Sequence, residues 1–130
     1  MKSHVKNLLI KLEFYSDADD ANEFYMKAIT LKELKKAKDD GEYGGDIDVS
    51  NTTILDCLNK AVDLDSDEPM FVVERGNFYF EIDDHTNAQS DLQHALTMKI
   101  PEYNYVRKRH TQNLLESLEE KLNVSQRPVM

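Results

Sequence analysis

Apolar residues recur along the chain at the three- and four-residue spacing of amphipathic helices, and polar or glycine-containing segments separate these stripes. The pattern predicts six helices and gives no convincing strand, so we expect an all-α fold. The predicted helices cover residues 3–15, 21–38, 50–64, 69–82 and 86–98, followed by a last helix that begins at Pro101.

The last predicted helix carries its apolar stripe at every fourth residue. A histidine occupies one position of this stripe, and we expect it to be a partly buried packing residue rather than a catalyst. Residues 125–130 are expected to form a frayed tail. The stripe consists of Val106, His110, Leu114, Leu118 and Leu122.

Two of the predicted helices repeat one another at a distance of 34 residues. A fixed period of this length is typical of proteins built from stacked helical hairpins, in which each unit covers the apolar face of the next. Such proteins usually bind other proteins. The matched positions are Ile54 with Ala88, Leu58 with Leu92, Ala61 with Ala95, Val62 with Leu96, and Leu64 with Met98.

The best-formed unit spans residues 69–101 and resembles a tetratricopeptide repeat. The family pattern is W-x2-L-G-x2-Y, then A-x3-F, then P. In this chain the corresponding residues are Val72-x2-Arg75-Gly76-x2-Tyr79, then Ala88-x3-Leu92, then Pro101. The resemblance implies that Gly76 and Ala88 are small because the two helices of the pair cross there. Tyr79 would fill the gap beside the crossing. Valine replaces the tryptophan of the pattern, and leucine replaces the phenylalanine.

Arg75 stands where the repeat pattern usually has leucine. Similar repeats with an Arg-Gly pair typically carry an acidic residue on the second helix, and Asp91 is in that place. An unpaired guanidinium at an interior position would be costly. We therefore expect Arg75 and Asp91 to form an ion pair across the two helices, with a structural role.

The earlier unit matches the repeat only in its second helix, residues 50–64. The position 34 residues before Gly76 is Glu42, which lies in a glycine-containing segment. We expect the first helix of that unit at about 21–38, with the segment 39–50 inserted. The chain would then be one domain, residues 1–130, with about one and a half repeats and extra helices at both ends. A face that these helices leave open would favour a homodimer.

The inserted segment 39–50 is predicted to be a mobile acidic loop, because three glycines stand among five carboxylates. In a flexible loop these carboxylates are more often solvated than bound to a metal. A metal-dependent hydrolase that uses the region of Asp46 and Asp48 is therefore the least favoured interpretation. The acidic residues are Asp39, Asp40, Glu42, Asp46 and Asp48.

The composition narrows the classes of function. With 16 basic and 25 acidic residues, the net charge of -9 disfavours nucleic acid and anionic membranes as partners. Cys57 is the only cysteine, so no internal disulfide is possible, and we expect a buried, inert thiol in a cytoplasmic protein. No phosphate-binding loop or nucleophile motif occurs. Asp63, Asp65, Asp67 and Glu74 copy the ligand spacing of a calcium loop, but Glu68 stands where that loop needs glycine and Pro69 follows, so we do not expect calcium there. We expect no enzyme activity, no cofactor and no metal.

The function that fits this sequence best is the binding of a partner protein or peptide in a helical groove. In similar repeats the first helix of each pair lines that groove, which here implies Met70, Val73, Asn77 and Phe80 as contact residues. The alternative is that these four only pack against the N-terminal helices. A second hypothesis is a stoichiometric inhibitor, such as an immunity protein that neutralises a basic toxin. The acidic loop would then steer association electrostatically.

Overall fold

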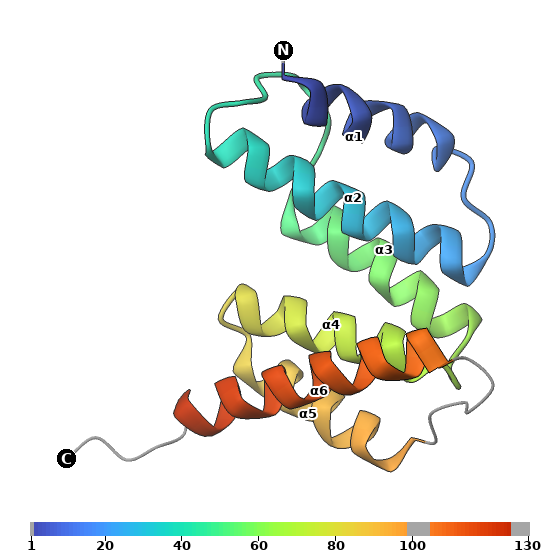
Figure 1. Ribbon diagram of the computed structural model, residues 1–130, viewed down its shortest axis with the longest axis vertical. Coiled ribbons are helices and arrows are strands. Elements are labelled where there is room, and N and C mark those ends of the chain that lie inside the picture. Colours follow the sequence, from blue (N-terminus) through green and yellow to red (C-terminus); the bar gives the residue numbers. More distant parts are fainter. Residues whose placement is uncertain (1, 99–104, 126–130) are drawn as a thin grey trace. The chain divides into compact units, whose positions relative to one another are not determined.

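The computed structural model describes residues 2–98 and 105–125, and this part of the chain contains six helices and no strand (Figure 1). The first five helices begin and end within one residue of the predicted bounds. The predicted start of the last helix at Pro101 and the predicted tail after residue 125 lie outside the described residues. The helices are α1 (Ser3–Phe14), α2 (Ala21–Asp39), α3 (Asn51–Leu64), α4 (Pro69–Glu81), α5 (His85–Thr97) and α6 (Tyr105–Ser125).

The contacts within the chain divide it into two compact units, Met1–Asp65 and Ser66–Met130. In the first unit α2 lies between α1 and α3, and forms an antiparallel hairpin with α3 (Figure 1). In the second unit α4 and α5 form an antiparallel hairpin, and α6 packs on both. None of the described helices combines the length and the apolar character that crossing a bilayer requires.

Local signals in the sequence explain where the helices begin. Asp20, Ser50 and Asp84 stand directly before α2, α3 and α5, and each side chain accepts a hydrogen bond from a backbone N–H in the first turn. Proline occupies the first position of α4, where its missing N–H costs no hydrogen bond. The donors are Glu23 N at 2.8 Å, Thr53 N at 3.3 Å and Asn87 N at 3.3 Å.

Residues in the left-handed region follow the ends of α2 and α4. Gly41 has φ of 77° and Asp83 has φ of 64°. This conformation lets the following backbone N–H donate back to a carbonyl of the last helical turn, which satisfies a group that the helix leaves unpaired. These bonds run from Glu42 N to Ala37 O and from Asp84 N to Tyr79 O, each 2.8 Å long.

The second unit is built around a close crossing of α4 and α5. A Cβ atom added to Gly76 would lie 3.0 Å from Cβ of Asp91, 3.2 Å from Cδ2 of Leu118 and 3.5 Å from the carbonyl oxygen of Ala88. Ala88 has no exposed surface. Both small residues therefore lie at the crossing, as the sequence predicts. Tyr79 is half-buried beside it and packs on the cluster formed by Ala88, Leu92, Leu118 and Leu122.

The predicted stripe of α6 is wrong in its central part. His110 is exposed, whereas its neighbour Thr111 is buried, with 1% of its surface accessible. Four residues advance a helix by about 40° more than one full turn, so a strict four-residue spacing drifts away from the core. The buried face instead follows Thr111, Leu118 and Leu122. The side chain of Val106 lies outside the described part.

We predict that Gly76→Leu lowers the free energy of unfolding by about 2 kcal/mol or more. The new side chain has no room between Asp91 and Leu118, and overpacking outweighs the better helix propensity of leucine. Gly44→Leu is the matched control, because a Cβ atom at exposed Gly44 would meet nothing within 4 Å. Its expected effect in urea unfolding is within about 0.5 kcal/mol. Equal effects of the two substitutions would contradict the close crossing.

Candidate functional site

The four predicted contact residues of α4 differ in their accessibility. Met70 and Val73 are buried, with 6% and 0% of their surface exposed. Asn77 and Phe80 are half-buried. The Asn77 amide donates a hydrogen bond of 3.0 Å to Oε1 of Glu81, one turn further along the helix. Within this predicted set, only Asn77 and Phe80 have appreciable accessible surface.

Phe80 contributes to the packing of the second unit. Its ring stacks on His85, with centroids 5.0 Å apart and an angle of 17° between the planes. The ring also packs against the cluster of Ala88, Leu92, Leu118 and Leu122, and Lys121 Nζ lies 5.9 Å from its centroid. Truncating Phe80 would therefore weaken the packing as well as alter the surface.

A signal for the burial of Met70 and Val73 is present in the sequence. Residues 70–73 are four consecutive apolar residues, Met-Phe-Val-Val, and they cover every side of one helical turn. A helix that is apolar all round is buried. Spacing along one face of a helix does not distinguish contact residues from buried ones where the opposite face is apolar as well.

Arg75 and Asp91 form the ion pair that the sequence predicts. Nε of Arg75 lies 2.9 Å from Oδ2 of Asp91, and its Nη2 lies 2.7 Å from Oδ1. This is a two-pronged contact between a planar guanidinium and a carboxylate, which combines charge with fixed geometry. The side chains are 20% and 8% exposed. The pair joins α4 to α5 next to the crossing at Gly76.

The acidic segment between α2 and α3 is packed, in contrast to the predicted mobile loop. Tyr43 and Val49 are buried, and the Tyr43 hydroxyl accepts a hydrogen bond of 3.3 Å from Ile47 N. Glu42 lies 2.7 Å from Nε2 of His4, and Lys2 Nζ approaches it at 3.4 Å. The two buried side chains interrupt the polar pattern of the segment and tie it to the first unit.

Asp48 acts on the start of α3. Its Oδ1 accepts from Ser50 N at 2.9 Å, and its Oδ2 accepts from the Thr53 hydroxyl at 2.6 Å. These bonds, first the one from Thr53 and then those from Ser50, lower the pKa of Asp48 from 3.8 to about 2. The carboxylate therefore serves the helix start. Asp39, Asp40 and Asp46 are exposed.

A hollow of about 500 Å³ lies between α1 and α2 in the first unit. Leu8 and Ala37 supply its apolar part, and the other lining residues are polar or charged with both signs. On the sequence alone these residues are typical of a solvated helix surface. Only the packing of α1 against α2 brings them together. The polar residues of the lining are His4, Asn7, Lys11, Glu33, Lys36, Asp40 and Glu42.

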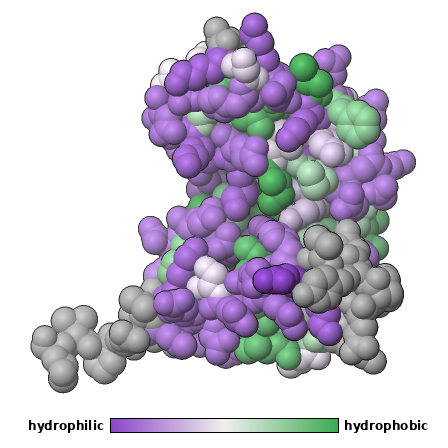
Figure 2. Space-filling model, viewed as in Figure 1, coloured by the Kyte–Doolittle hydropathy of each residue, from purple (hydrophilic) through white to green (hydrophobic). Residues whose placement is uncertain are grey.

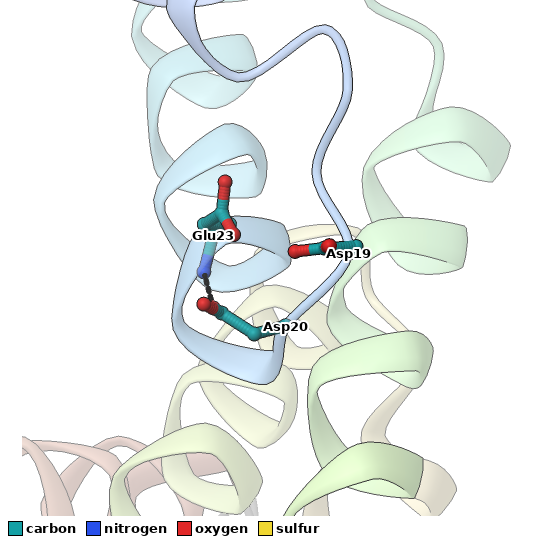
Figure 3. A group of neighbouring side chains, drawn as sticks. All are labelled: Asp19, Asp20 and Glu23. Atoms are coloured by element: carbon teal, nitrogen blue, oxygen red, sulfur yellow. Dashed lines mark hydrogen bonds between the residues drawn. The ribbon is translucent and has the colours of Figure 1, made fainter.

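Three carboxyl groups lie close together at the start of α2, namely those of Asp19, Asp20 and Glu23 (Figure 3). Hydrogen bonding with Asp19, and then with Asp20, raises the pKa of Glu23. Such a group can supply three oxygen ligands, whereas calcium takes six to eight. Asp19 and Asp20 are exposed, and Asp20 caps the helix through Glu23 N. The cap accounts for the carboxylate of Asp20.

Cys57 has the surroundings of a packing residue. It lies on α3 with 6% of its surface exposed, and burial raises the pKa of its thiol. The reactive form of cysteine is the thiolate, which a raised pKa disfavours at neutral pH. The thiol therefore has no feature of a nucleophile.

We predict that Asp91→Ala lowers the free energy of unfolding by about 3 kcal/mol, because it leaves the Arg75 guanidinium largely buried without this carboxylate. Glu120→Ala removes an exposed carboxylate from α6 of the same unit, and its expected effect is within about 0.5 kcal/mol. Urea unfolding followed by circular dichroism measures both. A change below about 1 kcal/mol for Asp91→Ala would contradict a stabilising role of the pair.

The lowered pKa of Asp48 predicts a pH-dependent contribution to stability. The ionised carboxylate is favoured in the folded chain, so this contribution is present above pH 3.8 and is lost as the pH falls towards 2. Asp48→Asn should destabilise the protein at pH 5, and its difference from the wild type should vanish near pH 2. Asp46→Asn is the control, because it makes the same change at an exposed position of the same segment. A constant difference for Asp48→Asn between these pH values would refute the helix-start role of the charge.

Comparison with known proteins finds no family model, no curated protein and no solved structure that matches this chain.

Proposed function

We propose that this chain is a tetratricopeptide-like protein that binds a partner protein or peptide and catalyses no reaction itself. The observation that carries the proposal is the crossing of α4 and α5. There Gly76 meets Ala88 and Asp91 at short distance, and Arg75 pairs with Asp91 beside it. This arrangement agrees with the repeat pattern in its small residues, its helix pairing and its Arg-Gly variant. Hairpins of this type stack to present surfaces on which other proteins dock.

The proposed contact surface includes the accessible side of α4 around Asn77. In similar repeats the first helix of each pair faces the groove, and α4 is the first helix here. The amide of Asn77 offers both a donor and an acceptor to a peptide backbone, and its present partner is Glu81 on the same helix. Phe80 adds aromatic surface next to it, although part of its ring belongs to the packing.

An acidic inhibitor of a basic toxin is the second candidate, and one observation favours it. Asp39, Asp40 and Asp46 are exposed on one segment and add to the net charge of -9. The other two carboxylates of that segment are engaged within the chain, Glu42 with His4 and Asp48 with the start of α3. This leaves a smaller charged surface than the sequence suggests, so the groove-binding proposal is preferred.

The test is affinity purification of the tagged full chain from a lysate of its source cells, with bound proteins quantified by mass spectrometry. Asn77→Lys places a long cation on the proposed surface, and Gln89→Lys makes the same charge change at an exposed position of α5. We expect a stoichiometric partner with the wild type and with Gln89→Lys, and its loss with Asn77→Lys. Circular dichroism checks that both variants fold.

Two results would contradict the proposal. If no protein is recovered in stoichiometric amount, the proposal that the chain binds a partner protein is contradicted. If the wild type, Gln89→Lys and Asn77→Lys recover the same amount of partner, α4 is not part of the contact surface. The ionic strength separates the two candidates, because electrostatic steering falls steeply with salt. An association rate that drops at least about tenfold between low and moderate salt would favour the inhibitor.

A further inference from the structure

The hollow between α1 and α2 contains four charged side chains with no ion partner among the described residues. Lys11 and Lys36 carry positive charge, and Glu33 and Asp40 carry negative charge. None of the four forms an ion pair or a side-chain hydrogen bond within that part of the chain. Glu42, by contrast, is held by His4 and Lys2 at one end of the hollow. The four charges sum to zero, so the hollow suits an occupant with charges of both signs.

The lining residues of α1 form one row along the helix. His4, Asn7 and Lys11 follow one another at steps of three and four, and Phe14 is the next position of the same row. The row is about 15 Å long at 1.5 Å per residue. An extended chain of four or five residues covers this distance at about 3.3 Å per residue.

Phe14, the next position of the row, has an exposed apolar side chain, and so does Ile10 beside the row. Phe14 is 74% exposed and Ile10 is 66% exposed, and they lie one turn apart on α1. They are the most exposed of the large hydrophobic side chains in the described part of the chain. Figure 2 shows mainly hydrophilic residues on the face in view, with hydrophobic ones in small groups. An aromatic ring that is exposed beside a polar hollow is a suitable anchor for a partner.

We infer that the hollow and the adjoining side of α1 bind an extended peptide segment of a partner protein. The segment carries an acidic side chain for Lys11 and Lys36, a basic side chain for Glu33 and Asp40, and an apolar side chain that packs on Phe14. A hollow of about 500 Å³ falls within the usual size of ligand sites, which is about 300–1,000 Å³. A small molecule in the hollow would leave Phe14 uncovered, whereas an extended peptide can contact the hollow and Phe14 at the same time. The inference rests on the proposed function in that its occupant belongs to a partner protein.

The test begins with selection of short random peptides, displayed on phage, against the immobilised full chain. We expect enriched peptides that combine an acidic, a basic and an apolar or aromatic residue. One enriched peptide is then synthesised with a fluorophore, and its dissociation constant is measured by anisotropy. Lys11→Glu with Lys36→Glu should weaken binding at least about tenfold, and Phe14→Ser at least about fivefold.

The matched control is Lys6→Glu with Lys38→Glu, which makes the same charge change on the same two helices at exposed positions outside the hollow. Its expected effect is below about twofold. Equal weakening by both lysine pairs would show a net-charge effect and overturn the inference. Enriched peptides that bind every variant equally would also overturn it, and the proposed function would stand. A third result is possible, in which a peptide binds in the hollow but Asn77→Lys does not change the recovery of a cellular partner. This result would support the inference and count against α4 as the contact surface.

Discussion

The close approach of α4 and α5 at Gly76 is the constraint on which the second unit depends. A side chain larger than hydrogen at this position would meet Asp91 on α5 and Leu118 on α6, so three helices share one point of contact. The same closeness allows Arg75 to reach Asp91 with two short hydrogen bonds. Those bonds offset the cost of removing the guanidinium and the carboxylate from water. The small residue and the ion pair therefore act together.

Features that depend on local chemistry could be predicted from the sequence. The helix bounds follow from apolar spacing, from the capping residues Asp20, Ser50 and Asp84, and from a proline at the start of α4. The pairing of Arg75 with Asp91 could be predicted because the repeat pattern leaves a charge at an interior position. In the second unit, the spacing of small and charged residues was therefore enough to predict a contact between α4 and α5.

Features that depend on the packing of distant segments of the chain against one another could not be predicted from the sequence in this way. Tyr43 and Val49 stand in a segment of glycines and carboxylates, and only the folded chain shows that they are buried. The hollow beside α1 has the same cause, since Lys11 and Glu33 belong to surfaces that each resemble a solvated helix face. On α6 the buried position is Thr111 and not His110, because a strict four-residue spacing does not follow one face of a helix with 3.6 residues per turn.

Nuclear Overhauser spectroscopy of the isotope-labelled full chain can measure the close crossing of α4 and α5 at short range. A Cβ at Gly76 would lie 3.0 Å from Asp91 Cβ and 3.2 Å from Leu118 Cδ2. We therefore expect strong cross-peaks from the Gly76 Hα protons to the Asp91 Hβ protons and to a Leu118 methyl group. Absence of both cross-peaks in a folded, fully assigned protein would contradict the crossing and the repeat-type hairpin inferred from it.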